Sequence, residues 1–319
     1  MNKQARIFVA GHRGMVGSAL VRRLAADGYQ NVITRSRKEL DLTDQAAVNR
    51  FFESEKIDVV LLAAARVGGI LANATQPGEF IYENLVIETN VIHAAYRAKV
   101  ERLVFFGSSC IYPKQCPQPI REEYLLTSPL EPTNDAYAIA KIAGVKLCEA
   151  YNREYNTQYV ALMPTNLYGP NDNYDLKSSH VLPALLRKAH EAKLNGDATL
   201  TVWGSGTPLR EFLHVDDLAA ATLFVLEHNV TEGLFNVGVG NDLSIRELAE
   251  CICKVVGFEG ELVFDASKPD GTPRKLLDVS RLAHMGWQAT IGLTDGIAST
   301  YRDFVESHAG STPAAAIEA

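Results

Sequence analysis

The sequence has little that would suggest a membrane protein, a secreted protein or a nucleic-acid-binding protein. Its 319 residues contain no apolar run near the roughly 20 residues needed to cross a bilayer, and no apolar signal core precedes the first strand-like run. The formal net charge of −7 opposes non-specific attraction to nucleic acid. We therefore expect a cytoplasmic protein that acts on a small molecule, with neither a membrane nor a nucleic acid as its partner.

Cysteine is also scarce, and the few cysteines do not form a recognisable pattern. The chain has 5 of them, an odd number without paired zinc spacing: Cys110, Cys116, Cys148, Cys251 and Cys253. This usage predicts no disulfide framework and no metal site, and it favours a reducing compartment.

Short apolar runs alternate with amphipathic stretches through the first half of the chain. The runs predict strands at 6–10, 31–34, 59–63, 103–106 and 159–163, and the stretches predict helices at 16–27, 44–55, 79–99 and 136–155. Such alternation is typical of right-handed βαβ crossovers and a mostly parallel sheet with helices on both faces.

A glycine-rich turn follows the first predicted strand. Gly11 permits a tight turn from strand to helix, Gly14 lets the backbone approach a pyrophosphate, and Gly17 allows close packing of helix on strand. The free amides at the start of that helix would bind the pyrophosphate. Small residues at such a turn also serve packing alone, but the position after the first strand of an alternating chain favours a dinucleotide site.

We therefore predict an α/β protein with a Rossmann-type doubly wound parallel sheet and a smaller C-terminal α/β lobe. The dinucleotide-binding domain is expected to span 1–166, and 211–240 is expected to return to it. Turn-forming residues become frequent after residue 164, so 167–210 and 241–308 are expected to form a substrate-binding lobe. Residues 309–319 are expected to be a disordered tail.

The end of the second predicted strand carries a basic cluster at 34–38 (TRSRK), and no carboxylate follows until Glu39. NAD-selective sites place an acidic residue about 20 residues past the glycines to bind the ribose 2′-hydroxyl. Arg37, together with Arg13 of the glycine turn, suits the 2′-phosphate of NADP instead, because arginine pairs with phosphate through two hydrogen bonds. The alternative is a solvated run of charges, and we predict NADP(H).

Tyr137 and Lys141 lie four residues apart in a predicted helix, so their side chains share a face. A nearby ammonium lowers the pKa of a tyrosine, and Tyr137 would then give a proton to a carbonyl oxygen as hydride arrives. Lys141 would also bind the nicotinamide ribose. Ser108, at the end of the fourth predicted strand, would orient the same oxygen. Tyrosine and lysine at this spacing are commonplace alone, so the prediction rests on the whole set.

Together these residues resemble the extended short-chain dehydrogenase/reductases that act on nucleotide sugars. The resemblance is carried by the glycine turn, Leu62-Ala63-Ala64-Ala65, Ser108 and Tyr137-x-x-x-Lys141. Further matching segments are 10–17, 107–113, 164–170, 179–181, 203–207, 210–217 and 268–275. The likeness therefore covers nearly the whole chain except its tail.

The resemblance is closest to homodimeric, NADPH-dependent, bifunctional members of that family. They invert C3 and C5 of GDP-4-keto-6-deoxy-D-mannose and then reduce C4, which gives GDP-L-fucose, so the same reaction is implied here. Protons at C3 and C5 become removable when Tyr137 and Ser108 stabilise the enolate oxygen. By position, the resemblance assigns proton exchange to Cys110 and His180, whose reference pKa values of about 8.5 and 6.5 bracket neutral pH. Which of them is the base at which carbon stays open.

The resemblance also implies contacts with the cofactor and the substrate. Cofactor contacts would come from Gly11, His12, Arg13, Gly14, Met15, Val16, Gly17, Arg37, Asp41, Leu62, Ala63, Ala64, Lys141, Pro164, Asn166, Leu167 and His180. Lys188, Arg210 and Lys275 would bind the diphosphate, Trp203 would cover the base or sugar, and Asp270 would accept from a hydroxyl or ring nitrogen. Relatives can carry arginine in place of Lys188. A core tryptophan and a turn-capping aspartate remain the alternatives for the last two.

Other functions are compatible with parts of this pattern. The nearest alternatives are a related nucleotide-sugar 4-ketoreductase and a GDP-colitose synthase. A plain 4-epimerase would recycle tightly held NAD and would not need Cys110 and His180. A non-catalytic NADP-binding regulator belongs to another class, and the intact set of Ser108, Tyr137 and Lys141 argues against it.

Overall fold

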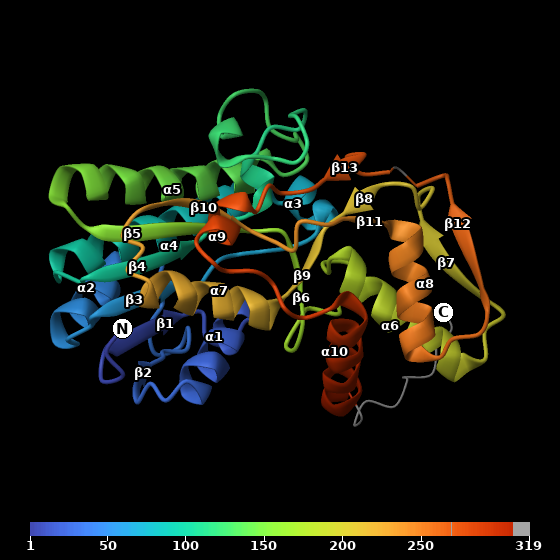
Figure 1. Ribbon diagram of the computed structural model, residues 1–319, viewed down its shortest axis with the longest axis horizontal. Helices are drawn as coiled ribbons and strands as arrows, with labels where there is room; N and C mark the ends of the chain where they lie inside the picture. The colour runs from blue at the N-terminus through green and yellow to red at the C-terminus, as the bar shows by residue number, and fades with distance from the viewer. Residues whose placement is uncertain (269, 309–319) are drawn as a thin grey trace.

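The chain folds into two lobes, as the computed structural model in Figure 1 shows. The structure describes residues 1–268 and 270–308, so the tail expected at 309–319 lies outside the described residues. The first lobe is built on a parallel sheet of six strands in the order β10-β5-β4-β3-β1-β2. These are β1 (Arg6–Ala10), β2 (Asn31–Ile33), β3 (Val59–Leu62), β4 (Arg102–Phe106), β5 (Gln158–Pro164) and β10 (Gly233–Val237).

Helices cover both faces of this sheet. One face packs against α2 (Gln45–Ser54), α4 (Pro77–Arg97) and α5 (Asp135–Tyr155), and the other packs against α1 (Met15–Ala26) and α7 (Val215–Glu227). The central strands are buried on both sides because their residues are almost all apolar. The predicted strands and helices of the first half are confirmed to within two residues at each end, and so is the fold class.

Residues 215–237 belong to this first lobe although residues 167–210 do not. Here β10 pairs with β5 at the edge of the sheet, and α7 packs against α1. Buried Arg102, at the start of β4, donates a hydrogen bond of 2.7 Å to the carbonyl of Val230, between α7 and β10. The chain therefore leaves the sheet after β5 and returns to complete it.

The second lobe packs its helices around a separate core. That core is formed by α6 (Val181–Asn195), α8 (Ile245–Val256) and α10 (Leu293–His308) together with β7 (Thr199–Trp203), which pairs with β12 (Glu261–Asp265). Next to it, β11 (Leu243–Ser244), β8 (Leu209–Arg210) and β13 (Arg274–Lys275) form a three-stranded sheet. The strands β6 (Asn166–Tyr168) and β9 (Phe212–His214) pair where the lobes meet.

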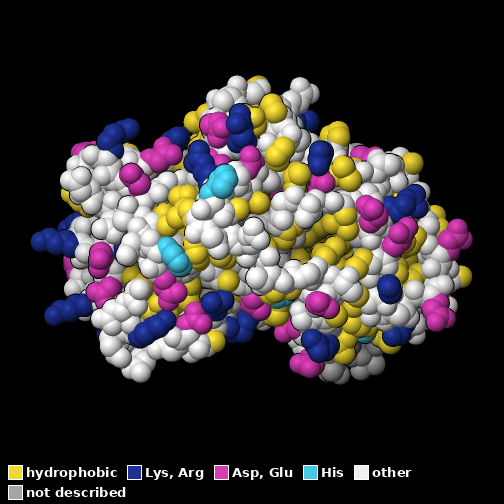
Figure 2. Space-filling model, viewed as in Figure 1, with side chains coloured by type: hydrophobic (Ala, Val, Ile, Leu, Met, Phe, Trp, Pro, Cys, Tyr) yellow, Lys and Arg dark blue, Asp and Glu magenta, His cyan; other side chains and the backbone are white. Residues whose placement is uncertain are grey.

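The surface in Figure 2 mixes positive and negative side chains rather than gathering them by sign. Within the described part of the chain, none of the helices combines the length and the apolar character that crossing a membrane requires.

Candidate active site

The glycine turn joins β1 to α1 as the sequence predicts. Gly11 has a φ of +85°, and a Cβ there would lie 2.7 Å from the amide nitrogen of Ala64. A Cβ on Gly17 would lie 2.1 Å from the carbonyl oxygen of Gly11, so the helix packs on the turn only because glycine stands there. Gly14 differs, because its Cβ would meet only one described atom, at 3.5 Å. The space beside Gly14 is thus left open at the start of α1.

The start of α1 suits a negatively charged group. Among the described residues, no side chain caps its first amides, and its first turn carries no acidic residue. Unpaired amides and the helix dipole both attract anions at such an end. The residues present therefore fit the pyrophosphate of a dinucleotide. Nδ1 of His12, buried in the same turn, likewise has no hydrogen-bond partner in the described part of the chain.

A cavity of about 480 Å³ lies beyond the end of β2, lined by Arg13, Ser36, Arg37 and Lys38. The nearby carboxylate of Glu39 accepts hydrogen bonds from the amide and hydroxyl of Ser36, at 2.7 and 2.6 Å, so it is engaged by a residue of the cavity wall. Three cationic residues, Arg13, Arg37 and Lys38, therefore line this cavity, which fits the 2′-phosphate of NADP.

Two neighbours of this cavity have local partners. Arg35 is bound elsewhere by Glu55, at 2.8 Å. Asp41, which the sequence assigned to the cofactor, accepts two hydrogen bonds from Thr43 and lies 3.8 Å from Arg37. Its contact with a cofactor stays a prediction, and in the structure Asp41 stabilises a turn through Thr43.

The remaining cofactor assignments lie at the carboxyl ends of the strands. Leu62 closes β3 with a fully buried side chain, so only its backbone is available to a ligand. Ala63 and Ala64 follow it beside Gly11. Pro164 ends β5, and the side-chain amide of Asn166 donates a hydrogen bond of 2.8 Å to the carbonyl of Glu211. Leu167 lies in β6, and Met15 and Val16 open α1. These positions stay predictions.

Tight packing of α5 on β4 brings the reductase residues together. Gly144 makes this approach possible, because a Cβ there would lie 2.3 Å from the ring of Phe105. Ser108 follows β4 and caps a 3₁₀ turn, η1 (Ser109–Ile111), by accepting from the amide of Cys110 at 3.4 Å. Lys141 lies one helical turn beyond Tyr137, and its Nζ is 5.9 Å from the centroid of the Tyr137 ring.

The expected effect of Lys141 on Tyr137 is wrong in this structure. Burial raises the pKa of Tyr137 well above 10, and the thiol of Cys110 and the carboxyl of Glu88 add to this shift. The physical reason is the burial of the phenol, and the ammonium of Lys141 is paired with Glu88, whose Oε1 lies 2.9 Å from its Nζ. Tyr137 therefore stays protonated at neutral pH and is a proton donor.

Glu88 is the residue of this site that sequence reasoning missed. It lies in the middle of α4 with 1% of its side chain exposed. Its helical neighbours Asn84, Val91 and Ile92 are also buried. A helical wheel of α4 places Glu88 on the same face as these three residues, and this was the available signal.

Cys110 and His180 reach the site from opposite lobes. Cys110 is buried in η1, and burial raises the pKa of its thiol while Lys275 lowers it. His180 precedes α6 in a loop that contacts the first lobe. The backbone amide of Gly69 donates a hydrogen bond of 2.9 Å to the carbonyl of Ser178 in this loop. Burial lowers the pKa of His180, and the charge of Lys275 lowers it further by a smaller amount. The ring of His180 is therefore neutral at physiological pH.

Lys275, predicted to bind a diphosphate, faces both of these residues. It pairs in register with Arg210 through β13 and β8, and its charge acts on the thiols of Cys110 and Cys116 as well as on His180. Its strand is bound to the first lobe, because the backbone amide of Leu276 donates a hydrogen bond of 2.9 Å to the side-chain oxygen of Gln118. A diphosphate contact stays a prediction, and the surroundings show a cation beside the proton-exchange pair.

The other substrate assignments cluster in the second lobe. Trp203 ends β7 and is 61% exposed, so it is not a core tryptophan. The Nζ of Lys188, from α6, lies 5.1 Å from its ring centroid. Arg210 lies close to the loop of Asp270, with which it interacts electrostatically. Both oxygens of Asp270 accept from Ser205, at 2.9 and 2.7 Å, so its contacts are those of a turn-capping residue.

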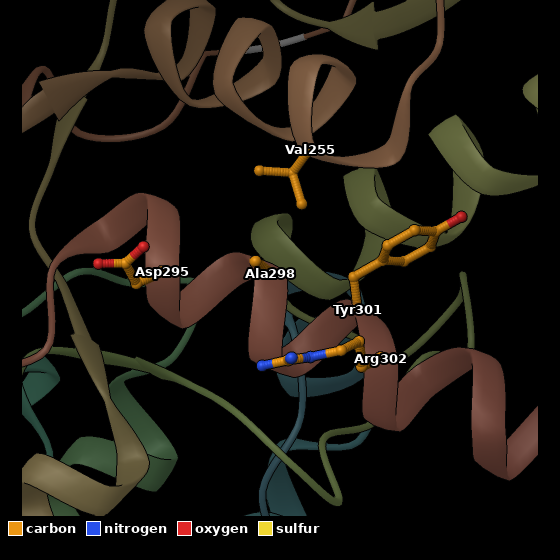
Figure 3. Close-up of a pocket in the computed structure, with 5 residues that line it drawn as sticks. All are labelled: Val255, Asp295, Ala298, Tyr301 and Arg302. Atoms are coloured by element: carbon orange, nitrogen blue, oxygen red, sulfur yellow. The ribbon is translucent and has the colours of Figure 1, made fainter.

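A second cavity, of about 430 Å³, lies between α8 and α10 (Figure 3). It is lined by Val255, Asp295, Ala298, Tyr301 and Arg302. None of the residues predicted from the sequence to take part in catalysis or binding lines it.

Known proteins with similar sequences agree with this geometry. The NAD dependent epimerase/dehydratase family matches residues 7–238. A GDP-L-fucose synthase of Escherichia coli (strain K12) is 58% identical over 316 residues, covering 96% of this chain and 98% of that protein. A GDP-L-colitose synthase of Yersinia pseudotuberculosis is 38% identical over 303 residues, covering 94% of this chain and 98% of that protein.

Among solved structures, a GDP-L-fucose synthetase from Naegleria fowleri bound to NADP superposes with a TM-score of 0.90 at 29% identity, covering 98% of this chain and 96% of that one. The resemblance inferred from the motifs is confirmed by these matches. The chain belongs to the NAD dependent epimerase/dehydratase family.

Proposed function

We propose that this protein is an NADPH-dependent bifunctional epimerase/reductase that converts GDP-4-keto-6-deoxy-D-mannose to GDP-L-fucose. The observation that carries the proposal is the placement of a thiol and an imidazole, Cys110 and His180, around Lys275 at the same site as Tyr137. A simple ketoreductase needs the tyrosine but has no use for two further groups able to exchange protons.

The epimerisation follows from the chemistry of the ketone. Ser108 and Tyr137 bind the C4 oxygen and stabilise the negative charge that develops when a proton leaves C3 or C5. One of Cys110 and His180 takes that proton, and the other returns one on the opposite face of the ring. Burial raises the pKa of the Cys110 thiol although Lys275 opposes it, and burial together with Lys275 lowers the pKa of His180, so the resting site holds a thiol with a proton to give and a neutral ring able to accept one.

The reduction uses the same oxygen. NADPH, when held by the glycine turn and the basic cavity, would supply a hydride to C4. Tyr137, which is protonated at neutral pH because burial raises its pKa, donates its proton to the C4 oxygen. Ser108 keeps that oxygen aligned, and Lys141 binds the nicotinamide ribose.

A deuterium exchange experiment tests both activities. The enzyme is incubated with GDP-4-keto-6-deoxy-D-mannose in heavy water, first without and then with NADPH, and the sugar is examined by NMR. We expect deuterium at C3 and C5 without NADPH, and GDP-L-fucose once it is added. Reduction without exchange would leave a 4-ketoreductase, and the absence of both would reject the proposed substrate.

A GDP-L-colitose synthase remains the second candidate for the reaction. The relative with that name is 38% identical to this chain, against 58% for the GDP-L-fucose synthase of Escherichia coli. The larger identity favours the fucose reaction. Parallel turnover of the corresponding 4-keto-3,6-dideoxy sugar nucleotide distinguishes the two.

Arg37→Ala is expected to weaken NADPH binding about 10- to 100-fold while NADH binding changes little. The reason is the loss of a charge-assisted hydrogen bond to the 2′-phosphate, worth about 1.5–3 kcal/mol. Fluorescence titration with both cofactors measures the difference. Arg50→Ala, an exposed arginine of α2, is the control. Equal losses for both cofactors would mean that Arg37 does not bind the phosphate.

We further propose that α4 and α5 form the contact between two copies of the chain. They lie side by side on one face of the sheet and expose large hydrophobic side chains, namely Tyr82, Ile139 and Tyr155, at 65%, 46% and 40%. A second copy applying the same two helices would bury them in a symmetric contact. The five unpaired cysteines fit a cytoplasmic location.

The double variant Tyr82→Glu/Ile139→Glu is expected to sediment as a monomer while the native protein sediments as a dimer, because four carboxylates would enter one apolar contact. Analytical ultracentrifugation measures the mass. Leu194→Glu changes a side chain of α6 that is 63% exposed and is the control. A dimer that the double variant leaves intact would place the contact on another surface. A native protein that sediments as a monomer would reject the contact.

A further inference from the structure

Glu211 lies at the joint between the two lobes, and its side chain is fully buried. Within the described residues the chain passes from one lobe to the other five times, at 164–166, 210–212, 238–242, 276–278 and 287–293. Glu211 belongs to the second of these passages. It also binds the first, because its backbone carbonyl accepts hydrogen bonds from the side chains of Thr165 and Asn166, at 3.2 and 2.8 Å.

The carboxylate of Glu211 binds two further passages. Its Oε1 accepts hydrogen bonds from the backbone amides of Val239 and Gly240, at 2.7 and 2.8 Å. Its Oε2 accepts one from the backbone amide of Leu277, at 3.1 Å. A Cβ on Gly238 would lie 2.2 Å from Oε1, so the chain leaving β10 approaches the carboxylate this closely because it has a glycine there. Four of the five passages therefore meet at one residue.

The two strands that end at this joint carry cationic residues of the site. Arg210 of β8 directly precedes Glu211, and Lys275 of β13 lies two residues before Leu277. Arg210 and Lys275 also pair in register. Leu277 is itself buried in the core of the first lobe. The bond between Glu211 and Leu277 therefore limits how far Lys275 can move relative to that lobe.

Lys275 is the charged group that Cys110 and His180 share. Burial raises the pKa of the Cys110 thiol and the charge of Lys275 opposes this, while burial and then the same charge lower the pKa of His180. A displacement of Lys275 would thus change both pKa values in the same direction. Other groups that interact electrostatically with one of these three side chains include Lys141, Tyr137, Arg210, Cys116 and Glu131.

We propose that Glu211 is a positioning residue that fixes Lys275 beside Cys110 and His180 by holding the end of β13 to the first lobe. This inference rests on the proposed function, in which Cys110 and His180 exchange protons at C3 and C5. Glu211 thus acts on the exchange through Lys275 and does not touch the sugar.

Glutamine has the shape of glutamate but does not fit this joint. A backbone amide only donates hydrogen bonds, and glutamine offers one acceptor oxygen where the carboxylate offers two. Because Oε1 serves two amides and Oε2 serves one, we expect the single oxygen of glutamine to stay with Val239 and Gly240. The amide of Leu277 would then lose its acceptor, and Lys275 would be free to move away from the proton-exchange pair.

The direction of the expected change follows from the sign of the charge. A cation lowers the pKa of a nearby thiol and of a nearby imidazole, so moving Lys275 away raises both values. Exchange needs one group that accepts a proton and one that gives a proton, so its rate is bell-shaped in pH and the two pKa values set the limbs. Both limbs therefore move to higher pH, whichever residue is the base.

The first measurement is the pH profile of deuterium exchange at C3 and C5 in the native enzyme and in Glu211→Gln. We expect both limbs to move to higher pH by about 1 unit in the variant, the lower end of the effect of a neighbouring charge. Lys275→Met should move the profile in the same direction, and adding Glu211→Gln to it should move the profile no further. An unmoved profile in Glu211→Gln, or a further shift in the double variant, would overturn the inference.

Asp217→Asn is the matched control, because Asp217 has the corresponding place at the fifth passage. Its buried carboxylate accepts hydrogen bonds from the backbone amides of Thr290 and Ile291, at 3.1 and 2.9 Å. This variant should lower the melting temperature as Glu211→Gln does and leave the exchange profile in place. An equal shift in Asp217→Asn would mean a general loosening of the joint and would reject the role of Glu211.

Gly238→Ala perturbs the same bonds without changing Glu211, and it is the variant to use if Glu211→Gln does not fold. The added Cβ would overlap the end of a flexible side chain rather than backbone, so the carboxylate moves and the fold is kept. We expect the exchange profile to move in the same direction as in Glu211→Gln. A profile that stays in place would contradict the inference.

A measurement without substrate separates this inference from the proposed function. The rate at which iodoacetamide alkylates Cys110, followed by mass spectrometry across a range of pH, reports the pKa of this thiol. We expect its midpoint to lie about 1 unit higher in Glu211→Gln than in the native protein, and equal midpoints would reject the inference. Native enzyme that exchanges no deuterium would reject the proposed function, while this measurement still reports on Glu211 and Lys275.

Discussion

Replacing Tyr137 by phenylalanine is expected to lower kcat for the reduction by about 10²- to 10⁴-fold, the usual contribution of a positioned proton donor. The ring would keep its edge-to-face contact with Phe80, at 6.2 Å between centroids, so the fold of the site should survive. The variant should bind NADPH as the native enzyme does, because the glycine turn and the basic cavity lie on other elements. Stopped-flow oxidation of NADPH measures the hydride step, and fluorescence titration measures binding.

Exchange at C3 and C5 should also slow in this variant, because the phenol helps stabilise the enolate. Tyr82→Phe removes a hydroxyl from α4 but keeps the ring that the proposed contact between two copies needs, and it is the matched control. Unchanged reduction in Tyr137→Phe would remove Tyr137 from the mechanism, and loss of NADPH binding would assign it to the cofactor instead.

Replacing Cys110 by serine is expected to slow deuterium exchange by about 10²- to 10⁴-fold and the hydride step far less. A serine hydroxyl keeps the shape of the side chain, but it ionises much less readily than a thiol and is a poor proton carrier at neutral pH. The position is buried, and burial raises the pKa of the thiol there. The groups that lower this pKa are Lys275, Ser108, Lys141 and the local backbone. Burial would disfavour ionisation of a serine hydroxyl in the same way. NMR exchange rates and single-turnover oxidation of NADPH measure the two steps separately.

Cys116→Ser offers a control that the chain itself supplies. Cys116 is a second thiol on which the charge of Lys275 acts, yet it lies in the loop after η1 and has no assigned part in proton exchange. It should leave both rates near those of the native enzyme. Equal losses of exchange and reduction in Cys110→Ser would contradict the division of roles, and an equal effect of both serine variants would assign the thiols to packing.

The first lobe was predictable because its residues carry strong local signals. An apolar run such as Val59–Leu62 predicts a strand buried between helices. The spacing of the glycines predicts a tight turn from strand to helix, which the structure shows. Tyr137 and Lys141 followed from helical spacing. The family resemblance indicated Cys110 and His180 as the residues that exchange protons. Their spacing in the sequence alone does not predict that they act together.

The rest depended on tertiary contacts that a local pattern does not encode. The strands β8, β11 and β13 each have two residues, too few for any periodicity, so the position of Lys275 beside Cys110 could not be derived. The charge balance at Lys141 was missed because a glutamate in an amphipathic helix is normally solvent-facing. Its burial depends on α5 packing against α4, and the direction of the Tyr137 pKa was missed chiefly because Tyr137 is itself buried.

The late return of β10 to the sheet has a consequence for how the protein is made. Until residue 237 has been synthesised, β5 presents an open edge of unpaired backbone groups, and such edges promote aggregation. A truncated gene ending after β5 would produce this exposed edge permanently, and it would also deprive Arg102 of its carbonyl partner at Val230. The cofactor-binding half is therefore not an independent module for expression, fusion or domain exchange, and the ribosome must deliver most of the chain before that half is complete.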